Sequence, residues 1–303
     1  DALPHGLDPL LAVHDAALIE HLATIWQRWE AGGYVTDYGR TRVVPYIFPT
    51  AGLLGGLPLR SAAAVHGQVG AFCYDTMTLV GPGSWEAIKA AADAALTAAD
   101  LVAAGQRVAY ALCRPPGHHA GKASYGGSCY LNNAAIAAAA LRSAGADRVA
   151  VIDIDAHHGN GTQAIFYDRA DVSYASAHVD PGAGWFPHYV GHADERGTGE
   201  GEGANLNVPL APGTGDDGWL AGVSALCAAA RGHGADAIVV SLGVDAAAAD
   251  PESPLQVSVD GYRRAGELIG ALGPVVAVQE GGYDLPSLGG LVVATLAGIL
   301  AAD

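Results

Sequence analysis

One stretch of the chain places three ionisable side chains at alternate positions. Residues 148–163 begin as an apolar run typical of a buried strand and continue as DIDAHHGNG from Asp153. Side chains of an extended strand alternate between its two faces, so Asp153, Asp155 and His157 are predicted to point the same way. Burying these groups together is costly unless a cation compensates their charge. The stretch therefore predicts a metal site at the end of a strand.

Three other apolar runs also end in unusual polar groups. His118 and His119 lie in RPPGHHA, Asp245 follows SLGV, and Tyr283 lies in QEGGYD. Open parallel sheets bind ligands outside the carboxyl ends of their strands. We therefore expect all four loops to meet at one site.

The expected ligand set is Asp155, His157 and Asp245. These residues would supply three nitrogen and oxygen ligands and leave a position for water, which is the pattern of a catalytic zinc ion. A dinuclear site would need further carboxylates, whereas the chain has Asn160 and Ala247 at the positions where they could stand. One metal ion is therefore favoured.

The chemistry expected at such a site is hydrolysis of an amide. Zinc lowers the pKa of water and polarises a carbonyl group. His118 and His119 would transfer the protons, with Asp153 favouring the charged form of one and the neutral Asn160 orienting the other. The histidine near Asn160 is then the better general base. Tyr283, on a Gly-Gly turn, is a candidate donor to the tetrahedral oxyanion.

Composition and charge limit the class of protein. Half of the 303 residues are apolar and 15% are charged, which excludes a disordered chain. A net charge of −16 with only 15 Lys and Arg residues excludes nucleic acid as a partner. The acidic surface would attract a cationic substrate, although it is also an ordinary aid to solubility.

The expected compartment is the cytoplasm. Four cysteines occur singly in apolar contexts, without CxxC spacing, and are predicted to be reduced core thiols. No signal-peptide pattern is present, and the apolar run 288–302 is shorter than the roughly 20 residues that span a bilayer. We expect no membrane partner. The sequence leaves open whether an N-terminal strand precedes Asp1.

Strands and helices alternate along the chain, which predicts a single α/β domain with a mostly parallel central sheet and helices on both faces. Ser84 is the expected N-cap of the second helix. Residues 31–60 form a long loop, expected to be a lid, a binding loop or an oligomer contact. The expected strands are 108–113, 149–152, 172–178, 237–244 and 274–279, and the expected helices are 1–30, 84–104, 132–144, 161–167, 219–231, 261–271 and 288–302.

Together these motifs resemble a known family. RPPGHHA, DIDAHHGNGTQ, SLGVDAAAADP and QEGGYD look like the zinc-dependent histone-deacetylase-like family of the arginase/deacetylase superfamily. Asn160, PGSWEA at 82–87 and the segment 176–210 are most similar to bacterial acetylpolyamine amidohydrolases. The resemblance covers nearly the whole chain. It implies a deacetylase-like catalytic domain over residues 1–303 with the arginase/deacetylase fold.

The resemblance also implies ions and catalytic roles. Zinc would lie on the three residues proposed above, and a structural potassium or sodium ion would lie near Asp153 and Ser176. His119 would act as general base and acid, His118 with Asp153 as its electrostatic partner, and Tyr283 would polarise the acyl carbonyl. Relatives of this kind are typically homodimers whose long early loop narrows the entrance, which suits residues 31–60. The carbonyls expected at the monovalent cation belong to Asp155, His157 and Ala177.

The implied substrate tunnel departs from the family pattern. Phe186 resembles one aromatic wall, but Ser128 stands after Gly127 where the opposite wall usually carries Phe or Tyr. His66 and Met77 occupy the positions of two glutamates that grip the distant amines of a polyamine. A buried ammonium needs a carboxylate partner, so acetylpolyamine is less favoured and a wider, less cationic tunnel could accept other acylated amines.

The expected function is a zinc-dependent deacetylase that hydrolyses an acetylated primary amine such as acetylpolyamine or acetyl-lysine. One alternative is an amidohydrolase acting on other small-molecule or aromatic amides, indicated by Ser128. A dimanganese ureohydrolase is disfavoured because ligands are lacking. A non-catalytic acyl-amine binding protein would be expected to have lost Tyr283 or a metal ligand, and the sequence retains them all.

Overall fold

Six parallel strands form the centre of the computed structural model, which describes residues 2–37 and 41–302. Their order in the sheet is β1-β6-β5-β2-β3-β4. Strand β2 is therefore central, with Asp153 at its end opposite Ser241 of β5 and Ser176 of β3. The strands are β1 (Val108–Ala111), β2 (Val149–Asp153), β3 (Val172–Val179), β4 (Asn205–Leu210), β5 (Ala237–Leu242) and β6 (Val275–Gln279).

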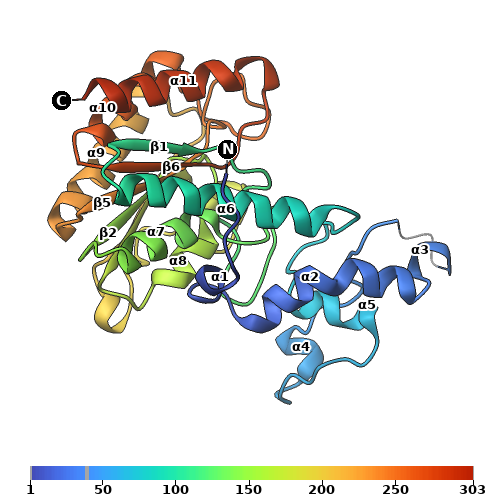
Figure 1. Ribbon diagram of the computed structural model, residues 1–303. Helices are drawn as coiled ribbons and strands as arrows, with labels where there is room; N and C mark the ends of the chain where they lie inside the picture. Colours follow the sequence, from blue (N-terminus) through green and yellow to red (C-terminus); the bar gives the residue numbers. More distant parts are fainter. Residues whose placement is uncertain (1, 38–40, 303) are drawn as a thin grey trace.

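Helices cover both faces of this sheet, as the sequence predicts (Figure 1). Along β2, Val149 and Val151 belong to one hydrophobic core, whereas Ala150 and Ile152 belong to the other. Because successive strand residues face opposite sides, a strand that is apolar throughout can serve two cores. The first core is covered by α6 (Ser84–Ala103), α7 (Asn133–Ser143) and α8 (Asn160–Phe166), and the second by α9 (Asp216–His233), α10 (Val259–Gly270) and α11 (Leu285–Ala301).

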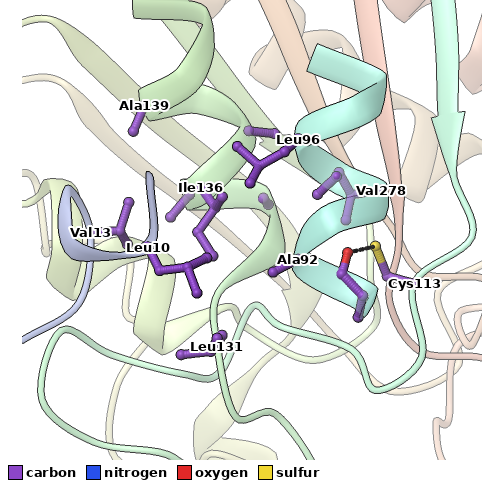
Figure 2. Close-up of a cluster of buried hydrophobic side chains, with 14 of the residues drawn as sticks. Leu10, Val13, Ala92, Leu96, Cys113, Leu131, Ile136, Ala139 and Val278 are labelled. Carbon is purple, nitrogen blue, oxygen red and sulfur yellow. Dashed lines mark hydrogen bonds between the residues drawn. The ribbon is translucent and has the colours of Figure 1, made fainter. Parts of the chain in front are cut away.

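The first core also holds the N-terminal segment in place. Figure 2 shows Leu10 and Val13 in the same cluster as Leu96 of α6 and Ile136 of α7. In this cluster the thiol of Cys113 donates a hydrogen bond to a backbone carbonyl of α6, at 3.2 Å. All four cysteines are free and buried, so the prediction of core thiols is confirmed.

The N-terminal region contains two helices rather than the single one expected over 1–30. They are α1 (Asp8–Leu11) and α2 (Ala16–Ala31). His14 lies at the break, where one ring nitrogen donates to the carbonyl of Gly121 and the other accepts from the backbone N–H of Asn132, both at 2.9 Å. The apolar spacing of three and four residues continues across the break, so periodicity alone did not reveal it.

Two further details of the structure differ from the prediction. Ser84 is the first residue of α6 rather than its N-cap, which is Gly83 in a left-handed conformation. The hydroxyl of Ser84 instead accepts from the N–H of Gly81. Strand β4 was not predicted, because Asn205 and Asn207 interrupt its apolar pattern with buried amides.

Residues 31–37 and 41–71 extend to one side of the sheet-and-helix body (Figure 1). We call the described residues of this region the arm. The arm contains α3 (Tyr34–Asp37), α4 (Ala51–Leu54), α5 (Val65–Gln68) and a 3-10 turn, η1 (Val69–Ala71). Residues 38–40 of the expected loop, like Asp1, lie outside the described residues. Across residues 2–37 and 41–302, no helix combines the length and hydropathy needed to cross a bilayer.

Candidate active site and metal centre

Asp155, His157 and Asp245 bring their side chains to one point. Nδ1 of His157 lies 3.2 Å from Oδ1 of Asp155 and 3.0 Å from Oδ2 of Asp245. One ligand atom from each residue lies within 4.8 Å of the others, and all three residues are buried. Zinc bonds to nitrogen and oxygen are roughly 2.0–2.2 Å long, and ligands at such bond lengths must approach one another closely. This group can therefore hold a metal ion.

The strand order explains why these residues meet. Because β2 and β5 are neighbours, the loops that follow them start side by side. The backbone N–H of Ala156 donates to Asp245 at 2.7 Å, and that of Gly281 donates to Asp155 at 2.8 Å. A Cβ on Gly243 would lie only 2.2 Å from Oδ2 of Asp155. Glycine is thus required where the backbone approaches this carboxylate.

Asp153 ends β2 and turns toward the histidine pair. Its Oδ2 accepts hydrogen bonds from Nδ1 of His118 and from the hydroxyl of Tyr174, both at 3.0 Å. Nε2 of His118 lies 3.9 Å from Asp155. Asp153 and Asp155 therefore both face the imidazole of His118. Asp155 and His157 themselves lie beyond the last residue of β2.

The two histidines have opposite electrostatic surroundings. Burial alone would lower the pKa of His118, but the carboxylates of Asp155, Asp153 and Glu280 outweigh burial and raise its pKa to about 10. Burial, followed by the charges of His118 and His157, lowers the pKa of His119 well below its usual value. At neutral pH, His118 is then a cation and His119 a neutral imidazole.

His119 is oriented by an amide. Its Nδ1 lies 2.7 Å from Oδ1 of Asn160, the first residue of α8. An amide oxygen can only accept, so Nδ1 carries the proton and the lone pair of the neutral ring is on Nε2. The hydroxyl of Tyr74 donates to the backbone carbonyl of His119 at 3.0 Å. His119 can therefore accept a proton at Nε2 from a fixed position.

Tyr283 is half exposed, and its ring centroid lies 6.5 Å from that of His157. Burial and the carboxylates of Asp245 and Asp155 raise the pKa of Tyr283 above its usual value. Its phenol is therefore protonated and can donate a hydrogen bond. Its backbone N–H donates to the buried carboxylate of Asp250 at 2.7 Å.

Two of the expected tunnel residues flank the ring of His119. Phe186 meets this ring edge to face at a centroid distance of 4.7 Å. A Cβ on Gly127 would lie 2.5 Å from the same ring. Ser128 follows in a left-handed conformation with its side chain exposed, and its N–H donates to the hydroxyl of Thr78 at 2.8 Å. The turn at Gly127 and Ser128 is thus held without an aromatic side chain.

The other two residues expected in the tunnel, His66 and Met77, lie in different segments of the structure. His66 lies in the arm, where its Nδ1 is 2.9 Å from the hydroxyl of Tyr34 and its ring contacts Tyr46. Among the described residues, no hydrogen bond or ring contact joins His66 to the histidine pair. Met77 is 65% exposed, in the same loop as Thr78, and so lies near the turn that carries Ser128.

Ser176 lies opposite Asp153 on the neighbouring strand, with its Oγ 2.8 Å from Nδ1 of His178. A second group of buried ligand atoms consists of His118, Cys129 and Glu280. We assign no ion to this second group, because Nδ1 of His118 is bonded to Asp153 and Glu280 already accepts two backbone hydrogen bonds.

Sequence reasoning assigned no role to two aspartates that position the site. Asp250 accepts from the backbone of Tyr283, as described above. Asp75 accepts from the N–H of Gly127 at 2.6 Å and from those of Met77 and Thr78, both at 2.8 Å. The signal that could have revealed Asp250 is the Asp-Pro pair at 250–251, which favours a turn. Asp75 has no comparable local signal.

Comparisons with known proteins identify the family of the chain. The family model of the histone deacetylase domain matches residues 3–299. Acetylpolyamine amidohydrolase 1 of Pseudomonas aeruginosa is 46% identical over 285 residues, which is 94% of this chain and 80% of the relative. Acetylpolyamine amidohydrolase of Mycoplana ramosa is 43% identical over 296 residues, covering 97% of this chain and 84% of the relative.

A solved structure extends the likeness to three dimensions. The crystal structure of acetylpolyamine aminohydrolase from Burkholderia pseudomallei superposes with a TM-score of 0.91 at 41% identity, covering 99% of this chain and 84% of that one. The chain therefore belongs to the histone deacetylase domain family. It is a hydrolase of amide bonds other than peptide bonds, and its similarity to bacterial acetylpolyamine amidohydrolases confirms the resemblance seen in the sequence.

Proposed function

We propose that the protein is a zinc-dependent deacetylase that hydrolyses the amide of an acetylated primary amine, with acetylpolyamine and acetyl-lysine as the nearest substrates. The observation that carries this proposal is the convergence of the Asp155, His157 and Asp245 triad with a charged and a neutral histidine and a protonated phenol. These groups match the needs of acyl transfer to water.

Zinc fits the donor set, since it binds carboxylate oxygen and imidazole nitrogen, and catalytic zinc sites have three protein ligands. When bound, zinc supplies Lewis acidity and lowers the pKa of water. Asp153 and Ser176, with the carbonyls of Asp155, His157 and Ala177, would hold a structural potassium or sodium ion. The support for that second ion is the pairing of Asp153 with Ser176 across β2 and β3.

His119 serves as general base and then as general acid. Its Nε2 accepts a proton from the attacking water and delivers it to the leaving amine, while Asn160 holds Nδ1. His118 stays cationic beside Asp153 and stabilises the negative charge that develops. Tyr283 donates its hydroxyl hydrogen to the acyl oxygen as that oxygen becomes an oxyanion.

The test is acetate release from a panel of acetylated amines, with and without a chelator. We expect metal-replete protein to release acetate and the chelated protein to be inactive. Metal-replete protein that binds an acetyl-lysine compound but cleaves no member of the panel would instead be an acyl-amine binding protein. The panel includes aromatic amides, because the small, exposed side chain of Ser128 favours a wider substrate tunnel.

Met77→Glu is expected to raise kcat/KM for acetylpolyamine by a factor of about 1.4 to 5. An exposed carboxylate can pair with a distant ammonium, and such pairs contribute about 0.2–1 kcal/mol. Kinetics of Met77→Gln provide the uncharged control, and an acetylated amine without a second charge should respond to neither change. An equal gain for both substrates, or no gain for acetylpolyamine, would show that Met77 does not face the distant amine.

We also propose that the arm is the contact between two copies of the chain. Leu53, Leu57 and Leu59 are each more than half exposed, and they line an apolar hollow of about 510 Å³. Leu57→Asp is therefore expected to convert a dimer into a monomer in light scattering, whereas Leu7→Asp, at another exposed leucine, leaves the dimer intact. A monomeric wild-type protein would contradict this proposal.

A further inference from the structure

Glu280 is a buried carboxylate that takes no direct part in the proposed reaction. It follows β6, three residues before Tyr283, and only 6% of it is exposed. Its Oε2 accepts hydrogen bonds from the backbone N–H groups of Gly117 at 2.7 Å and His118 at 3.1 Å. Its Oε1 lies 3.4 Å from the hydroxyl of Ser241. One side chain thus reaches the turn that carries both histidines.

These two N–H groups are the first donors that the turn offers. Pro115 and Pro116, just before Gly117, have no backbone N–H. Gly117 and His118 are buried, and an unpaired N–H in such a place is costly. A Cβ on Gly117 would lie 2.4 Å from the backbone nitrogen of Asn133, so the turn is also tightly packed. The carboxylate of Glu280 therefore satisfies both backbone donors at the start of a tightly packed turn.

The segment of Glu280 is also bonded to other parts of the site. The N–H of Gly281 donates to the ligand Asp155, and the N–H of Tyr283 donates to Asp250. Four consecutive residues thereby connect the phenol, a metal ligand and the histidine turn. One short piece of backbone thus contacts all three groups.

We infer that Glu280 is a positioning residue, which fixes the His118–His119 turn relative to Tyr283 and the metal ligands by accepting two backbone hydrogen bonds. This inference rests on the proposed function for its kinetic consequence, but the hydrogen bonds themselves can be tested without any substrate. Glu280 acts through the turn and touches no reacting atom.

Glu280→Met tests the inference with little change in volume. A thioether cannot replace the carboxylate oxygen that accepts both N–H groups, whereas the amide oxygen of a glutamine could still accept from them. We expect kcat to fall roughly 10²-fold, as small misplacements of catalytic groups do, with KM within about threefold of the wild-type value. Because burial raises the pKa of Glu280 to about 7, assays should be run at least one pH unit above that value.

Hydrogen exchange supplies the readout that needs no activity. In Glu280→Met, peptides covering residues 114–121 should exchange faster, while peptides of α9 exchange at the wild-type rate. Glu267→Met, on the exposed face of α10, is the matched control and should change neither exchange nor kcat. Glu280→Asp keeps the charge but shortens the side chain, so it should also exchange faster at the turn.

The outcomes separate the two proposals. Faster exchange confined to the turn, with a lower kcat and one metal ion per chain retained, supports the role of Glu280. A wild-type protein without hydrolase activity would refute the proposed function, yet the exchange result would still decide the position of the turn. Unchanged exchange at 114–121, a fall in kcat that matches a loss of metal, or failure of both variants to fold would overturn the inference.

Discussion

Asp245→Asn is expected to yield a folded protein that has lost its metal and its hydrolase activity. The asparagine oxygen can still accept from the N–H of Ala156, as Oδ1 of Asp245 does at 2.7 Å. The amide nitrogen cannot replace Oδ2, which lies 3.0 Å from Nδ1 of His157 in the ligand group. We expect metal affinity to fall at least ~10²-fold. Activity should fall by ~10³-fold or more, because a metal supplies several kcal/mol of transition-state stabilisation.

Metal content by mass spectrometry and acetate release measure these two effects together. Asp168→Asn, at an exposed position in the loop after α8, is the matched control and should leave both unchanged. Full activity in Asp245→Asn would remove Asp245 from the ligand set. A protein that kept its metal but lost activity would assign Asp245 a different part in the reaction.

Tyr283→Phe is expected to lower kcat about 10²- to 10³-fold with one metal ion still bound. The change removes only the hydroxyl, and losing one oxyanion donor costs about 2.7–4 kcal/mol. The backbone hydrogen bond from residue 283 to Asp250 does not involve the phenol, so the turn should keep its shape. Steady-state kinetics with a single acetylated amine, at metal saturation, provide the measurement.

A matched tyrosine identifies the cause of any loss in Tyr283→Phe. The hydroxyl of Tyr110 donates to Gln279 at 2.7 Å, on the neighbouring strand but outside the ligand group. Tyr110→Phe should therefore change kcat by less than about threefold. Near-normal turnover in Tyr283→Phe would exclude the phenol as an oxyanion donor, and an equal loss in both variants would indicate a general effect on the sheet.

The sheet and the metal group could be predicted because their signals are local. An apolar run followed by alternating Asp153, Asp155 and His157 reveals both a buried strand and the groups that it presents at its end. The loops that follow parallel strands meet at one edge of the sheet, so Asp245 is then predicted to lie beside them. In the structure, β2 and β5 are indeed neighbours, so this part of the prediction required no knowledge of packing.

Other features depended on contacts that sequence patterns do not encode. Strand β4 is held partly by buried amides, with Asn205 and Asn207 both donating to Gln163, at 2.9 and 2.8 Å. Its side chains therefore lack the apolar alternation that identifies a strand. Asp75 reaches the turn at Gly127 from 52 residues away, so its role depends on how two loops meet. Such partners become visible only once the chain is folded.

Zinc titration of the metal-free protein is the most direct measurement of the central claim. If one ion held by Asp155, His157 and Asp245 serves the histidine pair and Tyr283, acetate release should rise linearly with added zinc and level off at one equivalent per chain. Full activity before any metal is added, or a requirement for two equivalents, would contradict the account.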